Sequence, residues 1–183
     1  MAAVVRNPSS INVSNPLLTI VPGDVTSAST VEQSLKGHEI VFCTLGADQR
    51  GATTLYSAAA RSITKAMNTQ GVRRLMFLSN FGVLGETASN VRTSSSVFRA
   101  KLLLRATLQD PRRALDEIQK YDWEWMAVRP MRLTDGEPTD HYRIAVERLP
   151  KGGTHISRAD VAGFMLKQVH SDEYLHKIPA IAY

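Results

Sequence analysis

Several residues that could bind a ligand stand directly after apolar runs of the sequence. Gly23-Asp24-Val25, Leu45-Gly46 and Ser79 each occupy such a position. If the runs are parallel strands, their carboxyl ends meet at one edge of a sheet, which is where open α/β sheets bind ligands. A glycine at such an end lets a ligand come close to the backbone. The pattern therefore predicts a ligand site that is built from strand ends.

Three of the candidate polar residues also have a purely structural interpretation. Asp24 could form a turn, and Ser79 could bond to local backbone at the end of its strand. Arg6 ends the first apolar run and could be a solvated side chain. As a ligand residue, Arg6 would offer a guanidinium that forks onto phosphate oxygens. The residues by themselves leave both interpretations open.

The stretch Leu18–Gly46 organises the elements that must position these residues. Its two apolar runs flank an amphipathic segment in which Val31 and Leu35 form one helical face, and Gly37 ends that segment. The second run, Ile40–Leu45, is short and rich in β-branched residues, as buried parallel strands are. The stretch is therefore predicted to be a strand-helix-strand crossover unit, which is typical of doubly wound sheets.

Similar patterns predict the remaining elements of an α/β fold. They are a strand at 2–5, a helix at 55–70 capped by Thr53 or Thr54, a strand at 72–78, a helix at 98–120 broken at Asp110-Pro111, a strand at 123–130, a strand at 142–147, a helix capped by Ser157 with Asp160 as its capping-box partner, and a terminal edge strand at 177–183. We therefore predict a Rossmann-like, doubly wound and mostly parallel sheet.

The composition limits the class of protein. The 183 residues are 43% hydrophobic and 21% charged, which is enough for one domain, residues 1–183, with a sizeable core. The one cysteine, Cys43, lies inside an apolar run, so a disulfide framework is excluded and a reducing compartment is indicated. No apolar segment approaches the roughly 20 residues that span a bilayer. We expect a cytoplasmic protein with no membrane partner.

Other kinds of site are disfavoured by spacing. The net charge is +5, but the basic residues are scattered among acidic ones, so we expect no nucleic-acid partner. Gly46 and Gly51 are spaced as in a phosphate loop, yet the lysine that must follow is absent. None of the five histidines has metal-ligand spacing, so we expect no metal. The chain also contains no Tyr-x-x-x-Lys, the relay with which standard short-chain dehydrogenases move a proton.

The chain resembles a known family along nearly its whole length. After GDV and LG come VRRLMFLS, AVRP, LTDGEPT and ISRADVAGFM, in the order found in atypical short-chain dehydrogenase/reductases. The similarity is greatest to the NAD(P)H-binding group that includes flavin reductase, also called biliverdin-IXβ reductase, and the NmrA-like proteins. The resemblance implies a Rossmann-like fold and a nicotinamide cofactor.

The resemblance also implies roles for individual residues. The residues it implicates in cofactor binding are Arg6 at the 2′-phosphate, Asp24 and Val25 beside the adenine, Leu45 and Gly46 near the ribose and pyrophosphate, and Arg129 and Pro130, whose backbone lines the nicotinamide pocket. Ser79 corresponds to the serine that orients the substrate and is the candidate catalytic residue. Arg6 implies that NADPH is preferred over NADH.

Two functions of different class follow from the resemblance. The first is an NAD(P)H-dependent oxidoreductase of the flavin or biliverdin reductase type, which passes a hydride to a small-molecule acceptor without a Tyr-Lys relay. The second is a non-catalytic NmrA-like binding or redox-sensing module, or an inactive remnant with weak or no cofactor binding.

The family's opening strand, glycine-rich turn and helix have no counterpart in this sequence. We therefore expect an N-terminally truncated fold in which a central strand is absent between the Val4-Val5 strand and the Ile40–Leu45 strand. Two unpaired ladders facing each other would be costly, so we expect the gap to close. The N-terminal strands would slide across to pair with Ile40–Leu45, another chain would fill the gap by self-association, or the sequence is part of a longer product. We also expect cofactor binding to be weakened.

Overall fold

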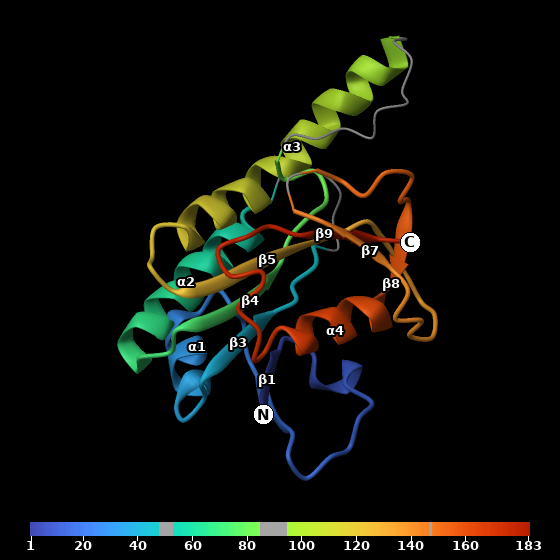
Figure 1. Ribbon diagram of the computed structural model, residues 1–183. Coiled ribbons are helices and arrows are strands. Elements are labelled where there is room, and N and C mark those ends of the chain that lie inside the picture. The colour runs from blue at the N-terminus through green and yellow to red at the C-terminus, as the bar shows by residue number, and fades with distance from the viewer. Residues whose placement is uncertain (48–52, 85–94, 147) are drawn as a thin grey trace.

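The computed structural model describes residues 1–47, 53–84, 95–146 and 148–183, and over 95–106 it describes the backbone alone (Figure 1). The elements in chain order are β1 (Ala2–Val5), a 3-10 turn (Pro8–Ser10), β2 (Thr19–Pro22), α1 (Ala28–Leu35), β3 (Ile40–Cys43), α2 (Leu55–Gln70), β4 (Arg74–Leu78), α3 (Ser95–Ile118), β5 (Glu124–Pro130), β6 (Arg132–Thr134), β7 (Arg143–Ala145), β8 (His155–Ser157), α4 (Arg158–Lys167) and β9 (Ala180–Ala182). This alternation of strands and helices confirms the predicted α/β class.

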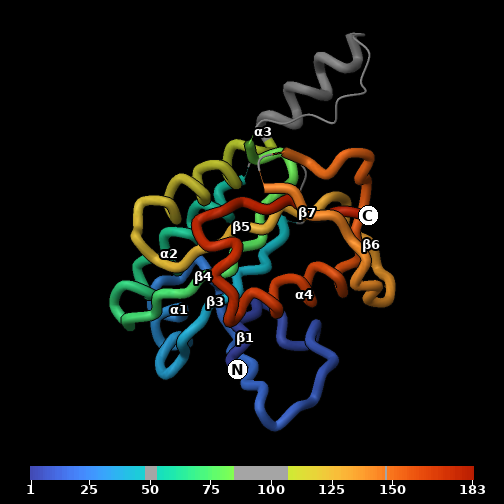
Figure 2. The backbone as a smooth tube through the Cα atoms, in the orientation of Figure 1, coloured from blue at the N-terminus to red at the C-terminus, as the bar shows by residue number. Residues whose placement is uncertain are grey.

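The main sheet has five strands in the order β3-β4-β5-β9-β7. Its first four strands are parallel, and β7 runs antiparallel to β9. The predicted mostly parallel sheet is therefore confirmed. The prediction that the C-terminal strand lies at an edge is wrong, because β7 turns back and pairs with its outer side, with Ile144 opposite Ile181. In Figure 2 the red C-terminal segment accordingly lies between β5 and β7.

Alternate side chains of the central strands build two separate cores. On β4, Leu75 and Phe77 pack into one core with α1, α2 and α3, whereas Met76 packs into the other. Figure 1 shows α4 on the side of the sheet opposite to the other three helices. From α4, Phe164 and Met165 complete the second core. Because both faces are covered, the strands carry apolar side chains at successive positions, such as Leu75, Met76 and Phe77 of β4, as buried parallel strands do.

The two N-terminal strands form a small sheet of their own. Strands β1 and β2 are parallel, with Val4 opposite Val21, and no pairing among the described residues joins β1 to β3. The expectation that these strands slide across to β3 is therefore wrong. The reason is that β1 is already held in place: the Thr19 N–H donates to the Met1 carbonyl at 2.9 Å, and β1 contacts α1, which packs against α2.

The polar group that caps α2 comes from α3. Asp110 is 1% exposed, and its carboxylate accepts from the backbone N–H groups of Tyr56 at 2.8 Å and Ser57 at 3.3 Å. The predicted cap is wrong for Thr54, whose side chain makes no capping bond, whereas the Thr53 hydroxyl accepts from the N–H of Leu55, the first residue of α2, at 3.1 Å. A carboxylate at a helix N-terminus satisfies free amides and favours the helix dipole.

The predicted break in α3 is also wrong. The helix is continuous from Ser95 to Ile118 with Pro111 inside it. A proline removes one helical hydrogen bond and usually bends the helix. Here the residues that follow are fixed by burial, because Ala114, Leu115 and Ile118 are all at most 1% exposed. Packing of this face therefore outweighs the local cost of the proline.

We predict that Asp110→Ala lowers the free energy of unfolding by about 2 to 3 kcal/mol, because one buried and one partly buried N–H group lose their acceptor. Asp110→Asn should cost less, since one carbonyl oxygen remains. Urea denaturation measures both. Asp116→Ala is the matched control: this aspartate of the same helix makes an exposed ion pair with Arg112, and its loss should cost no more than about 0.5 kcal/mol. Equal losses at both positions would contradict the assignment of Asp110 as a cap.

Candidate functional site

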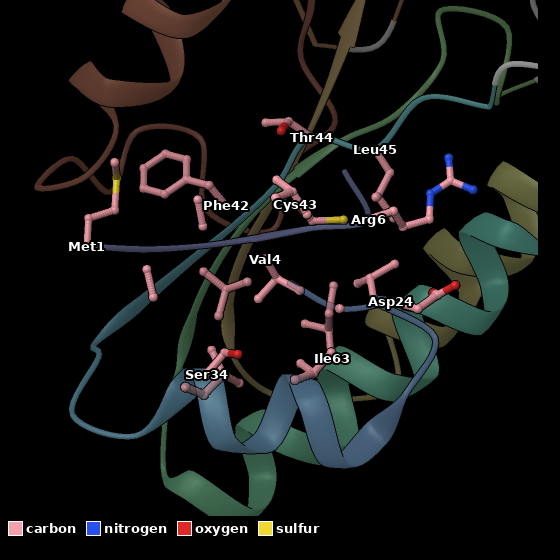
Figure 3. A pocket seen from close by; sticks show the side chains of 18 of the residues that line it. Met1, Val4, Arg6, Asp24, Ser34, Phe42, Cys43, Thr44, Leu45 and Ile63 are labelled. Carbon is pink, nitrogen blue, oxygen red and sulfur yellow. The ribbon is translucent and has the colours of Figure 1, made fainter. Parts of the chain in front are cut away.

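A cavity of about 740 Å³ separates β1 from β3, and we call it the slot. Its two long walls are the strands themselves, since Met1–Val5 and Ile40–Gly46 all line it. Figure 3 shows α1 and α2 on one side of the slot, where Ser34 and Ile63 lie, and Phe42 directed to the other side. The slot therefore occupies the plane of the sheet, at the place where the absent central strand was predicted.

Five predicted cofactor residues lie together at one end of the slot. Arg6, Asp24, Val25, Leu45 and Gly46 all line it, although they follow three different strands. Figure 3 shows Arg6, Asp24 and Leu45 at the end toward which β1 and β3 both run. This end is the carboxyl edge of the sheet, where the sequence predicted a ligand site.

Asp24 combines the two interpretations that the sequence left open. One carboxylate oxygen accepts from the N–H and the hydroxyl of Thr26, both at 2.8 Å, so Asp24 does form a turn. The same side chain is exposed at the slot and interacts with the positive charge of Arg6. The hydrogen bonds from Thr26, with a smaller contribution from Arg6, lower the pKa of Asp24. The carboxylate is therefore ionised at neutral pH and available to a ligand hydroxyl.

The two glycines of this edge differ in their surroundings. A Cβ atom on Gly23 would lie 2.4 Å from Cγ2 of Thr30, so the turn before α1 has room for glycine alone. A Cβ atom on Gly46 would meet nothing within 4 Å. The backbone at Gly46 therefore faces open space and can be approached by a ligand.

Ser79 lies one strand away from the slot. The register that pairs Cys43 with Phe77 places Leu45 and Ser79 at the same level, each two residues beyond the pair. The Ser79 N–H donates to the Val128 carbonyl at 2.7 Å, but its hydroxyl is buried and has no hydrogen-bond partner in the described part of the chain. The alternative in which this hydroxyl bonds to local backbone therefore gains no support from these residues.

Arg129 and Pro130 do not line the slot. Both are buried, and the Arg129 guanidinium, 0% exposed, donates to the carbonyls of Ile178 at 3.0 Å and Val146 at 3.2 Å. A third bond reaches the Phe81 carbonyl at 3.3 Å. The side chain of Arg129 thus joins three segments that are distant in sequence. The prediction for this pair concerned only its backbone, and it stays a prediction.

Sequence reasoning missed a second, smaller cavity beside the slot. It has a volume of about 250 Å³, shares Thr44 with the slot, and is otherwise lined mainly by apolar residues of β4, β6 and α4. Arg158, the first residue of α4, lines it and pairs with Asp135 at 2.6 Å. The one available signal was the position of Thr44, directly after a strand.

The motifs LTDGEPT and ISRADVAGFM meet at one buried carboxylate. Asp160 is 2% exposed and accepts from the N–H groups of Thr139 at 2.9 Å and Asp140 at 2.8 Å, and from the Tyr183 hydroxyl at 2.5 Å. Burial opposes its ionisation, but these hydrogen bonds outweigh burial and hold the pKa of Asp160 well below its usual range. The Asp160 N–H donates to the Ser157 hydroxyl at 3.0 Å, which confirms Ser157 as the cap of α4.

Two further kinds of feature are absent from residues 1–47, 53–84, 95–146 and 148–183. Nowhere in these ranges do three or more His, Cys, Asp or Glu side chains come together as a metal ion would require. Within the same ranges, none of the helices combines the length and apolar character needed to cross a membrane.

The chain is similar to known proteins over most of its length. Residues 1–172 match a protein family described as NAD(P)H-binding. A Rossmann-fold NAD(P)-binding family protein from Shigella flexneri is 26% identical, with a TM-score of 0.74 over 98% of this chain and 78% of that one.

Two other solved structures are similar in fold at lower identity. A short-chain dehydrogenase/reductase from Veillonella parvula in complex with NADP is 18% identical, with a TM-score of 0.70 over 97% of this chain and 76% of that one. An anaerobillin reductase from Escherichia coli O157:H7 is 19% identical, with a TM-score of 0.75 over 99% of this chain and 83% of that one. In each of the three structures, roughly a fifth of the protein has no counterpart here.

We predict that Cys43, the one cysteine of the chain, is unreactive in the folded protein. It lines the slot but is 4% exposed, and burial raises the pKa of its thiol to about 12. At pH 8 its thiolate should be about a thousandfold scarcer than that of the unfolded chain. Alkylation by iodoacetamide, followed by mass spectrometry, should be slower by at least that factor than in urea. Similar rates in the two states would show that the thiol is accessible and ionised.

Proposed function

The chain belongs to the NAD(P)H-binding family, and we propose that it is an NADPH-dependent oxidoreductase that transfers a hydride to a small-molecule acceptor of the flavin or biliverdin type. The match over residues 1–172 confirms the family resemblance of the sequence motifs. One observation carries the proposal: residues from three strand ends, each implicated in cofactor binding by that resemblance, line one cavity.

The residues present fit the adenosine end of NADPH. Arg6 supplies an exposed guanidinium that can bind the 2′-phosphate, and Asp24 supplies an ionised carboxylate beside it. Leu45 and Gly46 offer backbone that a ribose or phosphate can approach. When bound, the nicotinamide ring supplies the hydride. The protein's own task is to hold the cofactor and orient the acceptor.

Among the described residues, fewer groups are suited to bind the pyrophosphate of NADPH. Helix N-termini bind phosphates through free N–H groups. The first amides of α2 at Tyr56 and Ser57 already donate to Asp110, and in α1 the Thr30 N–H donates to the Ser27 hydroxyl at 3.5 Å. We therefore expect NADPH to bind to residues 1–183 more weakly than to a protein with a free helix N-terminus at this position.

Ser79 is the residue proposed to orient the acceptor. Its hydroxyl has no partner within the described ranges and can donate a hydrogen bond to a carbonyl or ring nitrogen. The chain contains no Tyr-x-x-x-Lys, so the proposed reaction does not use the Tyr-Lys relay of standard short-chain dehydrogenases. A flavin or biliverdin acceptor can take its proton from water once the hydride has been transferred, and such an acceptor mainly needs positioning.

A second candidate function is a non-catalytic module that binds or senses a nicotinamide cofactor in the NmrA-like manner. It is favoured by the occupied helix amides described above, which leave few groups to fix the cofactor for hydride transfer. The two candidates differ in one measurable property. A reductase oxidises NADPH continuously when FMN or biliverdin is added, whereas a sensing module binds NADPH without turnover.

Titration with NADPH, followed by the cofactor's fluorescence, tests both candidates. Saturable binding together with acceptor-dependent loss of absorbance at 340 nm supports the reductase. Binding without turnover supports the sensing module. No binding up to millimolar NADPH contradicts both.

We predict that Arg6→Ala weakens NADPH binding about 10- to 100-fold, because a charge-assisted contact with the 2′-phosphate is lost. NADH lacks this phosphate, so its affinity should change less than about threefold. Both dissociation constants are measured by the same titration. Arg112→Ala serves as the control, since it removes an exposed arginine of α3 that is paired with Asp116. Equal losses for NADPH and NADH would refute the role of Arg6.

We predict that Ser79→Ala lowers kcat at least about tenfold while leaving the midpoint of urea unfolding unchanged. The reason is that the hydroxyl bonds to none of the described residues, so its removal breaks no contact among them. Ser62→Ala is the matched control, because the Ser62 hydroxyl is also buried without a described partner but lies on α2 rather than at the carboxyl end of a strand. If the two variants behave alike in kcat, Ser79 does not orient the acceptor.

A further inference from the structure

Ser79 begins a short segment that strand β5 holds at two points. The Ser79 N–H donates to the Val128 carbonyl at 2.7 Å. Further along the chain, the Phe81 carbonyl accepts from the Arg129 guanidinium at 3.3 Å. Only Asn80 lies between the two residues that are held, and each residue has only two soft backbone dihedral angles. The place of the Ser79 hydroxyl is therefore set largely by these two bonds.

The turn that follows β4 is a compact unit with Phe81 inside it. The Val83 N–H donates to the Asn80 carbonyl at 3.1 Å, and the Gly82 N–H donates to the Asn80 side-chain oxygen at 3.2 Å. These two bonds close the turn on itself. The Val83 side chain anchors its far end in the core shared with α2 and α3. The bond from Arg129 to Phe81 anchors the near end to the neighbouring strand.

The Arg129 guanidinium is a fixed point to which this turn is attached. It is 0% exposed, and it also donates to the carbonyls of Ile178 at 3.0 Å and Val146 at 3.2 Å. Its backbone N–H donates to the Pro179 carbonyl at 2.8 Å, where β5 pairs with β9. A guanidinium spreads its donors over a planar fork and reaches carbonyls on several sides, whereas a lysine offers a single nitrogen atom. The shape of arginine therefore suits this position as well as its charge does.

We propose that Arg129 is a positioning residue for the acceptor: its guanidinium holds the Phe81 carbonyl and thereby fixes the Ser79 hydroxyl. This inference rests on the proposed function, in which that hydroxyl orients the acceptor for hydride transfer. An orienting group works only within about 0.5 Å of its productive place, and a misplacement of about 1 Å can cost on the order of 100-fold in rate. Because the Arg129 side chain is buried, its effect on the acceptor passes through Ser79.

Arg129→Lys is the test variant, because it keeps the positive charge and most of the apolar stem but loses the fork. It should lower kcat about tenfold. The KM for NADPH should change less than about threefold, since the groups proposed to bind its adenosine end lie at the slot. A KM that rises with an unchanged kcat would contradict the inference.

Arg74→Lys is the matched control. Arg74 is also a largely buried arginine, with a side chain that is 14% exposed, and it donates to the Val169 carbonyl at 2.8 Å. It is the first residue of β4, so it lies at the end of the strand opposite to Ser79. Arg74→Lys should leave kcat unchanged. A similar drop in kcat in both variants would contradict a role for Arg129 in positioning.

A double-mutant cycle shows whether Arg129 acts through Ser79. The Ser79→Ala protein has no hydroxyl to misplace, so the further change Arg129→Lys should lower its kcat less than about twofold. A residue with a merely structural role would lower kcat by the same factor in both backgrounds. Equal factors in the two backgrounds would therefore overturn the inference.

Hydrogen exchange measures the loosening of the turn without any ligand. In Arg129→Lys the amides of residues 79–83 should exchange at least about tenfold faster, whereas in Arg74→Lys they should keep the wild-type rates. Circular dichroism and thermal unfolding show whether each variant is folded. Unchanged exchange of these amides in folded Arg129→Lys would overturn the inference.

The wild-type protein provides a second test if Arg129→Lys does not fold. The amides of Gly82 and Val83 should then open together with the Arg129 N–H as urea is raised, because one guanidinium joins the turn to β5. Opening of the turn that does not depend on urea would contradict the inference.

The inference and the proposed function can fail separately. If the wild-type protein binds FMN or biliverdin but does not oxidise NADPH, the proposed function is contradicted. The double-mutant cycle measured on the dissociation constant of FMN, followed by quenching of its fluorescence, then decides the role of Arg129. If the wild-type protein turns over and the cycle shows no coupling, the proposed function stands and the inference is wrong. No binding of either acceptor overturns both.

Discussion

The need of parallel strands for hydrogen-bonding partners on both edges governs this structure. Strands β4, β5 and β9 meet that need, and each is buried on both faces. Strands β1 and β3 meet it on one edge only. The slot between them persists because β1 is fixed from its other side, by β2 and by α1. The same arrangement brings the carboxyl ends of β1, β2 and β3 around one cavity, and the candidate cofactor residues lie there.

Buried polar side chains connect segments that are not joined by hydrogen bonds between paired strands. Asp110 connects α3 to the start of α2, Arg129 connects β5 to the backbone before β9, and Asp160 connects α4 to the segment before β7. Each uses a charged group to bond backbone groups of a distant segment, which are costly to leave unpaired inside a protein. Two of the three residues lie in the sequence motifs that carry the family resemblance. Their presence in those motifs is therefore explained by folding as well as by ligand binding.

Local patterns in the sequence were sufficient to predict most helices and strands. They also predicted that the candidate ligand-binding residues lie close together. The helix at 55–70 has the predicted bounds, and Arg6, Asp24 and Gly46 meet because parallel strands bring their carboxyl ends together. Long-range choices were not predictable in the same way. The cap on α2 comes from Asp110, more than 50 residues away, and no local pattern identifies that partner. The persistence of the slot likewise depends on how firmly β1 is anchored, which is a property of tertiary packing.

The inner position of β9 affects how the chain can be assembled during synthesis. Ala180, Ile181 and Ala182 are each 0% exposed, and they separate β5 from β7. Because this strand follows the other described elements in the chain, a ribosome synthesises all of those elements before the middle of the sheet can close. Until then β5 and β7 present unpaired edges, and such edges promote association of incomplete chains. Closure of the sheet is therefore a late event that depends on contacts distant in sequence, which slows folding relative to local pairing.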